Sequence, residues 1–591
     1  MAVEIVKAEG AAADGRAVLR ERIQLHLDLI YPELDPGFAE RLIDVMGYVD
    51  PVESPDPHEN RWDESETIVI TYANSVVSDD EKPLHTLQTF LYGHLHDVIT
   101  SVHILPFFPY SSDDGFSVLN YRQVNESFGE WEDIEAIAGE YRLMSDLVVN
   151  HCSARSEWFE QFKRDEAPGR DYFVMADPAT DLSEVVRPRT SPLLRQVETT
   201  TGEKHVWCTF SHDQVDLNFA NPELLLEMVG IIGFYLDRGV RIFRLDAVAF
   251  LWKVPGTNCL NLPQTHEIVR LFRTLIEHRD PEALIITETN IPNRENLAYF
   301  GNGNESHIIY NFALPPLLLH AMMTGTGRYL SNWLMSMPPA QDGTTYLNFI
   351  ASHDGIGLRP VEGILTDDET DQLLTTMQQF GGHVSWRNLS SDVMKPYEIN
   401  ISLFSAMRGT IEGEDEWQIE RFLCAHAIMM ALEGIPAFYL HSLTATANDE
   451  EKVEYSGNNR AINRHVWQAD TLSALLADPT SVNSRVLAGM KRLLAVRCRQ
   501  PAFHPNATQY TLHLGEGLFS FWRQSRRREQ SIFCVHNITN QQQTFPLGGL
   551  NLVETNDWFD LFTGREYVNF REEVVLEPYE CLWLTNYRVA E

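Results

Sequence analysis

Eight short apolar runs, each followed by a stretch with helical periodicity, constrain the fold of this 591-residue chain more than any other feature. They span residues 66–73, 101–107, 142–150, 240–247, 283–289, 306–312, 346–352 and 434–440. This alternation is typical of parallel β/α units, and eight such units predict an α/β fold of the (β/α)8 or TIM-barrel type. A flavodoxin-type or Rossmann sheet is the alternative, but no G-x-G-x-x-G follows the first run.

The remaining segments predict three parts around a barrel formed by residues 66–151 and 214–505. Residues 1–65 carry helical periodicity and then a proline-rich stretch, which predicts an N-terminal helical extension ending in a linker. Residues 152–213 are too long for an ordinary connection and predict an inserted lobe over the active face, after the third strand. Residues 506–591 alternate apolar and polar side chains and predict a C-terminal antiparallel β-domain.

Composition excludes several classes of protein. The chain has 84 acidic and 46 basic residues, and its net charge of −38 would repel nucleic acid and anionic lipid. Any phosphate site must therefore be built from local cations. The sequence has neither a signal-peptide pattern nor an apolar stretch long enough to span a bilayer. Seven scattered cysteines without a C-x-x-C pair favour reduced thiols, so we expect a cytoplasmic protein without nucleic-acid or membrane partners.

Carboxylates stand at the ends of three predicted strands, where barrel enzymes keep their catalytic groups. Asp246 ends the fourth run, and Arg244 lies on the same side of that strand, where it would keep the carboxylate ionised, as a nucleophile requires. Glu288 ends the fifth run among apolar residues that could raise its pKa toward that of a proton donor. Asp354 ends the seventh run. Each one alone could be a capped strand end or a salt bridge, but together they indicate retaining glycosyl transfer.

Several motifs resemble the conserved regions of the α-amylase superfamily of retaining glycosidases, and they occur in the same order. They are DLVVNH (146–151), QVDLN (214–218), FRLDAVAF (243–250), ITETN (286–290) and ASHDGIG (351–357). Within that superfamily the chain is most similar to the sucrose phosphorylase group, through HILPFFPYSSDDGF (103–116), RPR (187–189), FALPPLLLHA (312–321) and NNRAINRH (458–465).

The resemblance implies roles for individual residues. Asp246 would be the nucleophile, Glu288 the general acid/base and Asp354 the stabiliser of the transition state. The residues implied to bind the glucosyl unit are Asp113, Phe116, His151, Phe210, Gln214, Arg244, His353 and Arg460. Phe116 and Phe210 would form an aromatic platform beside the developing cation, with ordinary core packing as the alternative for each.

The resemblance also implies a phosphate and acceptor site that contains Arg189 and the loop with Tyr397. Arg187 and Arg195 are neighbouring alternatives to Arg189, and plain surface charge is the alternative for each of these arginines. Val186, Asn290, Lys395 and Glu398 depart from the residues of sucrose phosphorylases proper. These departures leave glucosyl transfer intact and put fructose as acceptor in doubt. The pattern is closer to the longer relatives that act on glucosylglycerol or glucosylglycerate.

We therefore expect a phosphorylase that transfers an α-glucosyl group from sucrose, glucosylglycerol or glucosylglycerate to phosphate and forms α-glucose 1-phosphate. Its partners would be the sugar and inorganic phosphate. The resemblance implies no metal and no cofactor, and the sequence leaves a homodimer open. A glyceryl acceptor should be used better than fructose, although a glycerate carboxylate that suits Lys395 would sit badly beside Glu398. The alternatives are a hydrolase or transglycosylase of the same fold and a non-catalytic barrel, which would lack one or more of the carboxylates.

Overall fold

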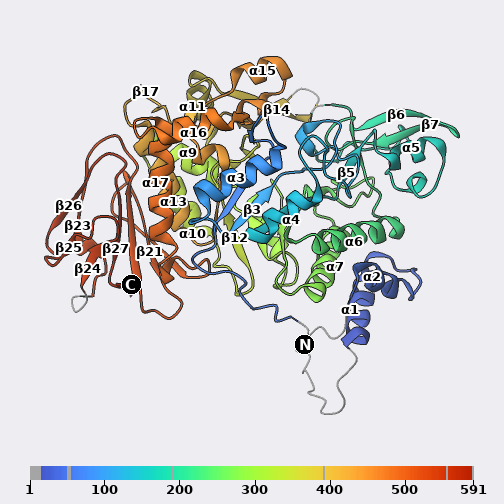
Figure 1. Ribbon diagram of the computed structural model, residues 1–591, viewed down its shortest axis with the longest axis horizontal. Helices are drawn as coiled ribbons and strands as arrows, with labels where there is room; N and C mark the ends of the chain where they lie inside the picture. Colours follow the sequence, from blue (N-terminus) through green and yellow to red (C-terminus); the bar gives the residue numbers. More distant parts are fainter. Residues whose placement is uncertain (1–14, 49–54, 190, 391–392, 554–556, 589–591) are drawn as a thin grey trace, which may run out of the picture.

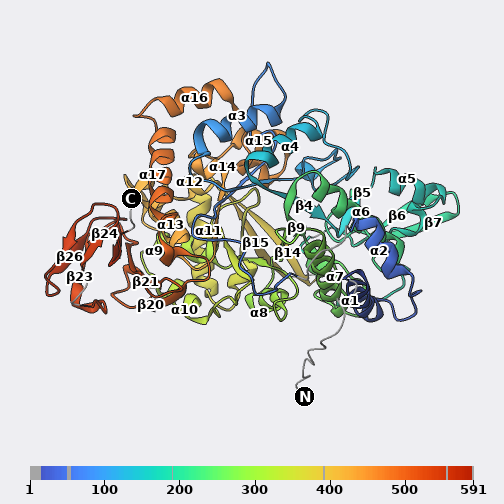
Figure 2. The same cartoon turned by 60° about the horizontal axis from the view of Figure 1, so that its bottom comes forward.

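The computed structural model describes residues 15–48, 55–189, 191–390, 393–553 and 557–588. Its centre is a closed barrel of eight parallel strands. Figures 1 and 2 show this barrel region in the middle of the molecule, with helices around it. In order around the barrel, the strands are β1 (Ile68–Thr71), β3 (Ser101–Ile104), β4 (Arg142–Val148), β9 (Val240–Asp246), β10 (Leu284–Thr287), β11 (Ile308–Tyr310), β12 (Thr345–Asn348) and β18 (Ile435–Tyr439). Each strand lies within one of the eight predicted runs or within one residue of it, so the predicted TIM barrel is confirmed.

Helices surround the barrel and bury its outer face, because the strands are apolar on both sides. The main ones are α3 (Pro83–Leu95), α4 (Trp131–Glu140), α6 (Pro222–Asp237), α7 (Pro263–Arg279), α8 (Asn293–Leu297), α9 (Leu314–Thr324), α10 (Arg328–Ser336), α13 (Gln418–Ala431), α16 (Ala469–Ala477) and α17 (Val482–Arg497). Among the described residues, no helix combines the length and the apolar character needed to cross a membrane.

Two helices precede the barrel, within the predicted N-terminal extension. They are α1 (Gly15–Ile30), which packs on α7, and α2 (Phe38–Met46), which packs on α6 (Figure 1). The apolar face of α1 buries Leu19, Ile23 and Leu27, and His26 Nδ1 lies 2.6 Å from a carboxylate oxygen of Glu267 in α7. These helices therefore extend the outer helical layer of the barrel.

A lobe follows strand β4 and lies beside the barrel, at the right of Figure 1. It contains β5 (His151–Ser153), α5 (Glu157–Arg164), the hairpin of β6 (Leu194–Thr199) and β7 (Gly202–Trp207), and β8 (Gln214–Asp216). Strands β5 and β8 pair antiparallel, with Ser153 opposite Gln214. Both ends of the lobe are thus fixed at the carboxyl end of β4, where His151 and Gln214 face the barrel mouth.

A second excursion separates β12 from β18, and its form was not predicted. It contains a three-stranded antiparallel sheet of β13 (Ile356–Gly357), β15 (Val393–Asn400) and β14 (His383–Ser390). Along the chain, helix α11 (Asp367–Gln379) lies between β13 and β14. The resemblance implied a loop around Tyr397, whereas the structure places Tyr397 on strand β15. In the structure, Pro396 pairs with Trp386 beside a register shift, a position at which a strand tolerates proline.

The C-terminal part is an antiparallel β-structure, at the left of Figure 1. Its six-stranded sheet runs β20 (Thr508–Leu512), β21 (Leu518–Gln524), β22 (Ser531–Asn537), β27 (Cys581–Thr585), β24 (Trp558–Asp560) and β25 (Glu566–Tyr567). A second pair is formed by β23 (Gln543–Pro546) and β26 (Glu573–Leu576). Arg523 on β21 is buried and donates to the carbonyl oxygens of Ala431 and His504, which ties the sheet to the barrel.

Candidate functional site

One pocket opens at the carboxyl ends of the barrel strands. Asp246 ends β9, Glu288 follows β10 and Asp354 follows β12, and all three side chains line this pocket. The structure brings most of the other predicted site residues to the same pocket, namely Asp113, Phe116, His151, Arg189, Phe210, Gln214, Arg244, His353, Tyr397, Glu398 and Arg460.

Arg244 forms the charged floor of the pocket. It is 3% exposed, and its Nη1 donates to Asp246 at 2.8 Å and to Asp146. Its Nη2 lies 4.0 Å from the nearer oxygen of Glu288. Asp146 is fixed from behind by His103, whose Nε2 lies 2.7 Å from the carboxylate. The guanidinium is thus held rigidly and orients Asp246 more closely than Glu288.

Burial raises the pKa of Asp246, and the neighbouring Glu288 raises it further, while Arg244 opposes both effects. Burial also raises the pKa of Glu288. Two buried carboxyls so close together titrate as a pair and tend to hold one proton between them. Arg244 donates to Asp246 at 2.8 Å and lies 4.0 Å from Glu288, so the guanidinium favours the ionised form of Asp246 more than that of Glu288. The backbone N–H of Ala247 donates to Glu288 Oε2 at 3.0 Å and fixes its position.

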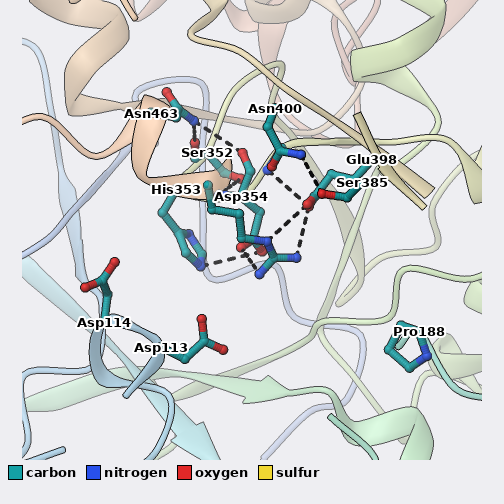
Figure 3. Close-up of polar contacts among 12 residues, drawn as sticks. Asp113, Asp114, Pro188, Ser352, His353, Asp354, Ser385, Glu398, Asn400 and Asn463 are labelled. Atoms are coloured by element: carbon teal, nitrogen blue, oxygen red, sulfur yellow. Dashed lines mark hydrogen bonds and ion pairs between the residues drawn. The ribbon is translucent and has the colours of Figure 1, made fainter. Parts of the chain in front are cut away.

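Asp354 is ionised and held by cations (Figure 3). Burial opposes its charge, but Arg460 and Arg464 lower the pKa of Asp354 below its usual range. Arg460 Nη1 lies 2.6 Å from Asp354 Oδ1, and His353 Nε2 lies 3.6 Å from Oδ2. Burial lowers the pKa of His353 to about 3, so its ring is neutral at neutral pH. The group can therefore offer both a carboxylate and a neutral imidazole to sugar hydroxyls.

Glu398, on β15, holds Arg460 beside Asp354. Arg460 donates to both of its oxygens, at 3.0 and 3.1 Å, and the N–H of Gly355 donates to Oε1 at 3.1 Å. Its side chain is therefore engaged by the protein, whereas the sequence analysis placed it at the acceptor.

Asp113, from the loop after β3, and the two ends of the inserted lobe also line the pocket. Gln214 Nε2 lies 3.2 Å from Asp113 Oδ2 and 3.2 Å from the ring of His151. Burial lowers the pKa of His151 to about 4, so this ring is also neutral at neutral pH. Phe116 stacks on His353, with ring centroids 5.2 Å apart and planes 7° apart. Polar donors and an aromatic face thus surround the space next to Asp246.

The predicted phosphate and acceptor residues divide into two groups. Arg189 and Tyr397 line the pocket, and the guanidinium of Arg189 lies over the ring of Phe210, at 5.6 Å. Arg187 does not line it, because its side chain turns away to donate to the carbonyl of Thr209 and to Ser191. Lys395 is exposed on β15 and also lies outside the pocket.

Arg359 is a further cation in the wall of the pocket, and it was not among the predicted site residues. It begins the short 3-10 helix η5 (Arg359–Val361) that follows β13. A signal was present, because this arginine comes five residues after Asp354, in a segment expected to enter the barrel mouth. Within the described ranges, no group of three or more His, Cys, Asp or Glu side chains is placed to hold a metal ion.

Comparisons with known proteins identify the family. Residues 95–354 match the model of the alpha amylase catalytic domain. The chain is 41% identical to a glucosylglycerate phosphorylase of Allomeiothermus silvanus over 96% of this chain and 98% of the relative. It is 26% identical to a sucrose phosphorylase of Streptococcus mutans over 74% of this chain and 88% of the relative.

Among solved structures, sucrose 6F-phosphate phosphorylase from Thermoanaerobacter thermosaccharolyticum has the same fold, with a TM-score of 0.70 and 24% identity, over 80% of this chain and 94% of that one. The expected resemblance is therefore confirmed. The chain belongs to the sucrose phosphorylase family of glucoside phosphorylases, in glycoside hydrolase family 13 of the α-amylase superfamily.

Proposed function

We propose that this enzyme is a glucosylglycerate phosphorylase, which converts α-glucosylglycerate and phosphate into α-glucose 1-phosphate and glycerate. The observation that carries the proposal is the 41% identity to a relative of that name across nearly both whole chains, against 26% to a sucrose phosphorylase. The pocket supports it, because Arg189 and Arg359 bring two cations to a site that must take two anions in turn.

In the first half-reaction, Asp246 attacks the anomeric carbon and the bond to the glycerate oxygen breaks. Glu288 gives its proton to that oxygen, so the oxygen leaves as a neutral hydroxyl group of glycerate, whose carboxylate stays ionised. Arg244 holds Asp246 in line at 2.8 Å. The ionised Asp354 and the aromatic face of Phe116 lie beside the positive charge that develops on the sugar.

In the second half-reaction, phosphate takes the place of glycerate. One phosphate oxygen attacks the anomeric carbon, its proton passes to Glu288, and the ester bond to Asp246 breaks. Two inversions give net retention and therefore α-glucose 1-phosphate. Arg189 is our candidate for phosphate, because it lines the pocket with a guanidinium that no described carboxylate pairs.

We also propose a cytoplasmic location, which the free thiols of all seven cysteines support.

The test is a panel of donors with the purified enzyme and phosphate. Glucosylglycerate, glucosylglycerol, sucrose and sucrose 6-phosphate are supplied separately, and α-glucose 1-phosphate is measured. We expect kcat/KM to be highest for glucosylglycerate. A higher value for sucrose or glucosylglycerol would overturn the proposed acceptor, and release of glucose without glucose 1-phosphate would indicate a hydrolase.

A further inference from the structure

Arg359 is a buried cation without a partner in the described part of the chain. Arg359 is 9% exposed. None of the described side chains or carbonyl groups accepts a hydrogen bond from its guanidinium or forms an ion pair with it. Its Nε is fully buried and unsatisfied. An arginine cannot lose its proton under physiological conditions, so burial without an anion is unfavourable. The guanidinium also lines the pocket, so a ligand can reach it.

Other buried arginines of this chain show what Arg359 lacks. Arg244 pairs with Asp146 and Asp246, Arg273 pairs with Glu277, and Arg421 pairs with Asp415. The neighbour of Arg359, Arg387, donates to Glu362 at 2.6 Å and so already has its own carboxylate. Burial and the positive charge of Arg387 both lower the pKa of Arg359. The carboxylates of Glu362 and Glu295 act on Arg359 through space, but they accept hydrogen bonds from Arg387 and Asn261 instead, so the guanidinium of Arg359 can still bind an anionic ligand.

Arg359 follows a segment that contacts the segment of Glu288, the proposed proton donor to the leaving group. Asn290, two residues after Glu288, lies against Gly357, two residues before Arg359. A Cβ built on Gly357 would come within 2.7 Å of Asn290 Nδ2. Asn290 Oδ1 is buried without a partner, as Arg359 Nε is. Glu288, Asn290 and Arg359 all line the pocket, and the approach of Asn290 to Gly357 brings the segment of Glu288 next to the segment of Arg359.

We propose that Arg359 binds the carboxylate of the acceptor and that Asn290 binds a hydroxyl of the same molecule. The ligand class is a small hydroxy acid, and this inference rests on the proposed function, in which that acid is glycerate. A guanidinium donates two parallel hydrogen bonds to a carboxylate, which a neutral polyol cannot accept with equal strength. Arg359 would therefore select glycerate over glycerol, while Arg189 serves phosphate.

The experiment compares wild type, Arg359→Gln and Arg359→Lys in the synthetic direction, with glucose 1-phosphate as donor and glycerate or glycerol as acceptor. Loss of a charge-assisted contact worth about 1.5 to 3 kcal/mol corresponds to a roughly 10- to 150-fold effect. We expect Arg359→Gln to lower kcat/KM for glycerate by a factor in this range, mainly through KM, and to change kcat/KM for glycerol less than about threefold. Arg359→Lys should recover part of the glycerate activity.

Two controls separate the possible causes. Arg387→Gln removes a neighbouring buried arginine whose carboxylate is internal, and it should leave the ratio of glycerate to glycerol unchanged. Hydrolysis of glucose 1-phosphate without any acceptor reports whether each variant is folded and competent in the first half-reaction.

Equal losses with glycerate and glycerol would show a structural role for Arg359 and overturn the inference. A second result would also overturn the inference. If the KM for glycerate is unchanged and the KM for phosphate, measured with the neutral donor sucrose, is raised, Arg359 binds phosphate. Either result would leave the proposed function standing. A wild-type enzyme that prefers glycerol to glycerate would overturn the proposed function and this inference together.

Discussion

At the scale of single residues, the proposed mechanism requires Glu288 to be protonated when the acceptor leaves and ionised when phosphate attacks. Its burial raises its pKa, whereas Arg244 lies close enough to favour the charge on Asp246 instead. In the proposed mechanism, two carboxyls of the same chemistry thus acquire different roles from one asymmetrically placed guanidinium.

The first prediction concerns the pH dependence that this asymmetry produces. Because donor cleavage needs protonated Glu288, and its pKa is raised, kcat/KM for phosphorolysis should fall as pH rises through that raised pKa. Glu288→Gln should lower kcat/KM by a factor of about 100 or more with glucosylglycerate. With α-glucosyl fluoride, whose leaving group needs no proton, the variant should accumulate an ester on Asp246, detectable by mass spectrometry. Asp246→Asn is the control and should form no ester; an ester on another residue would contradict the proposed roles.

The second prediction separates phosphate binding from general catalysis. Arg189→Ala should reduce phosphorolysis by roughly 10- to 150-fold, because a charge-assisted contact with the phosphate anion is lost. Hydrolysis of the glucosyl enzyme, measured as glucose release without phosphate, should change little, since water gains little from a guanidinium. Arg187→Ala is the matched control, because that side chain points away from the pocket. Equal losses of both reactions in Arg189→Ala would assign Arg189 a structural role.

At the scale of elements, the barrel strands were predictable, whereas the excursions were not. Each barrel strand is a short apolar run, and the rule that catalytic groups gather at carboxyl ends of strands located Asp246, Glu288 and Asp354. The direction in which a side chain points from a segment between barrel strands depends on the local backbone geometry. Arg187 and Arg189 are separated only by Pro188, yet one turns outward and the other faces the pocket. Arg359 was missed because its significance lies in the absence of a described partner, which a sequence does not reveal.

The β14–β15 hairpin gives the third prediction. Glu398 on β15 accepts two hydrogen bonds from Arg460, which in turn holds Asp354. If Glu398 positions this group, Glu398→Gln should lower kcat/KM by a similar factor, about tenfold, for glucosylglycerate, glucosylglycerol and sucrose alike. A loss confined to one donor would indicate instead that Glu398 contacts the acceptor. Lys395→Gln, on the exposed part of the same strand, is the control and should retain activity with every donor.

At the scale of the whole molecule, one loop joins the barrel to the C-terminal sheet just before β18. The N–H of Glu433 donates to Gln509 on β20 at 2.9 Å, and the N–H of Ala340 donates to the Glu433 carboxylate at 2.8 Å. Burial raises the pKa of Glu433 to about 6, only partly offset by these contacts and by Arg523. Above that pH, the interface therefore contains a poorly solvated charge that does not belong to the active site.

The last prediction follows from the sign of this shift. The folded state binds a proton at Glu433 more tightly than the unfolded state, so the stability gained by protonation is present below the unfolded pKa and is lost as pH rises through about 6. Glu433→Gln keeps an oxygen for the Ala340 N–H and removes the charge. We expect it to raise Tm at pH 8, by at most the equivalent of about 2 kcal/mol, and to leave Tm unchanged at pH 4.5, where Glu433 is already neutral. The exposed Glu416→Gln is the control and should have no effect at either pH. A lower Tm for Glu433→Gln at pH 8 would contradict this prediction and show that the ionised carboxylate stabilises the interface through the Ala340 N–H and Arg523.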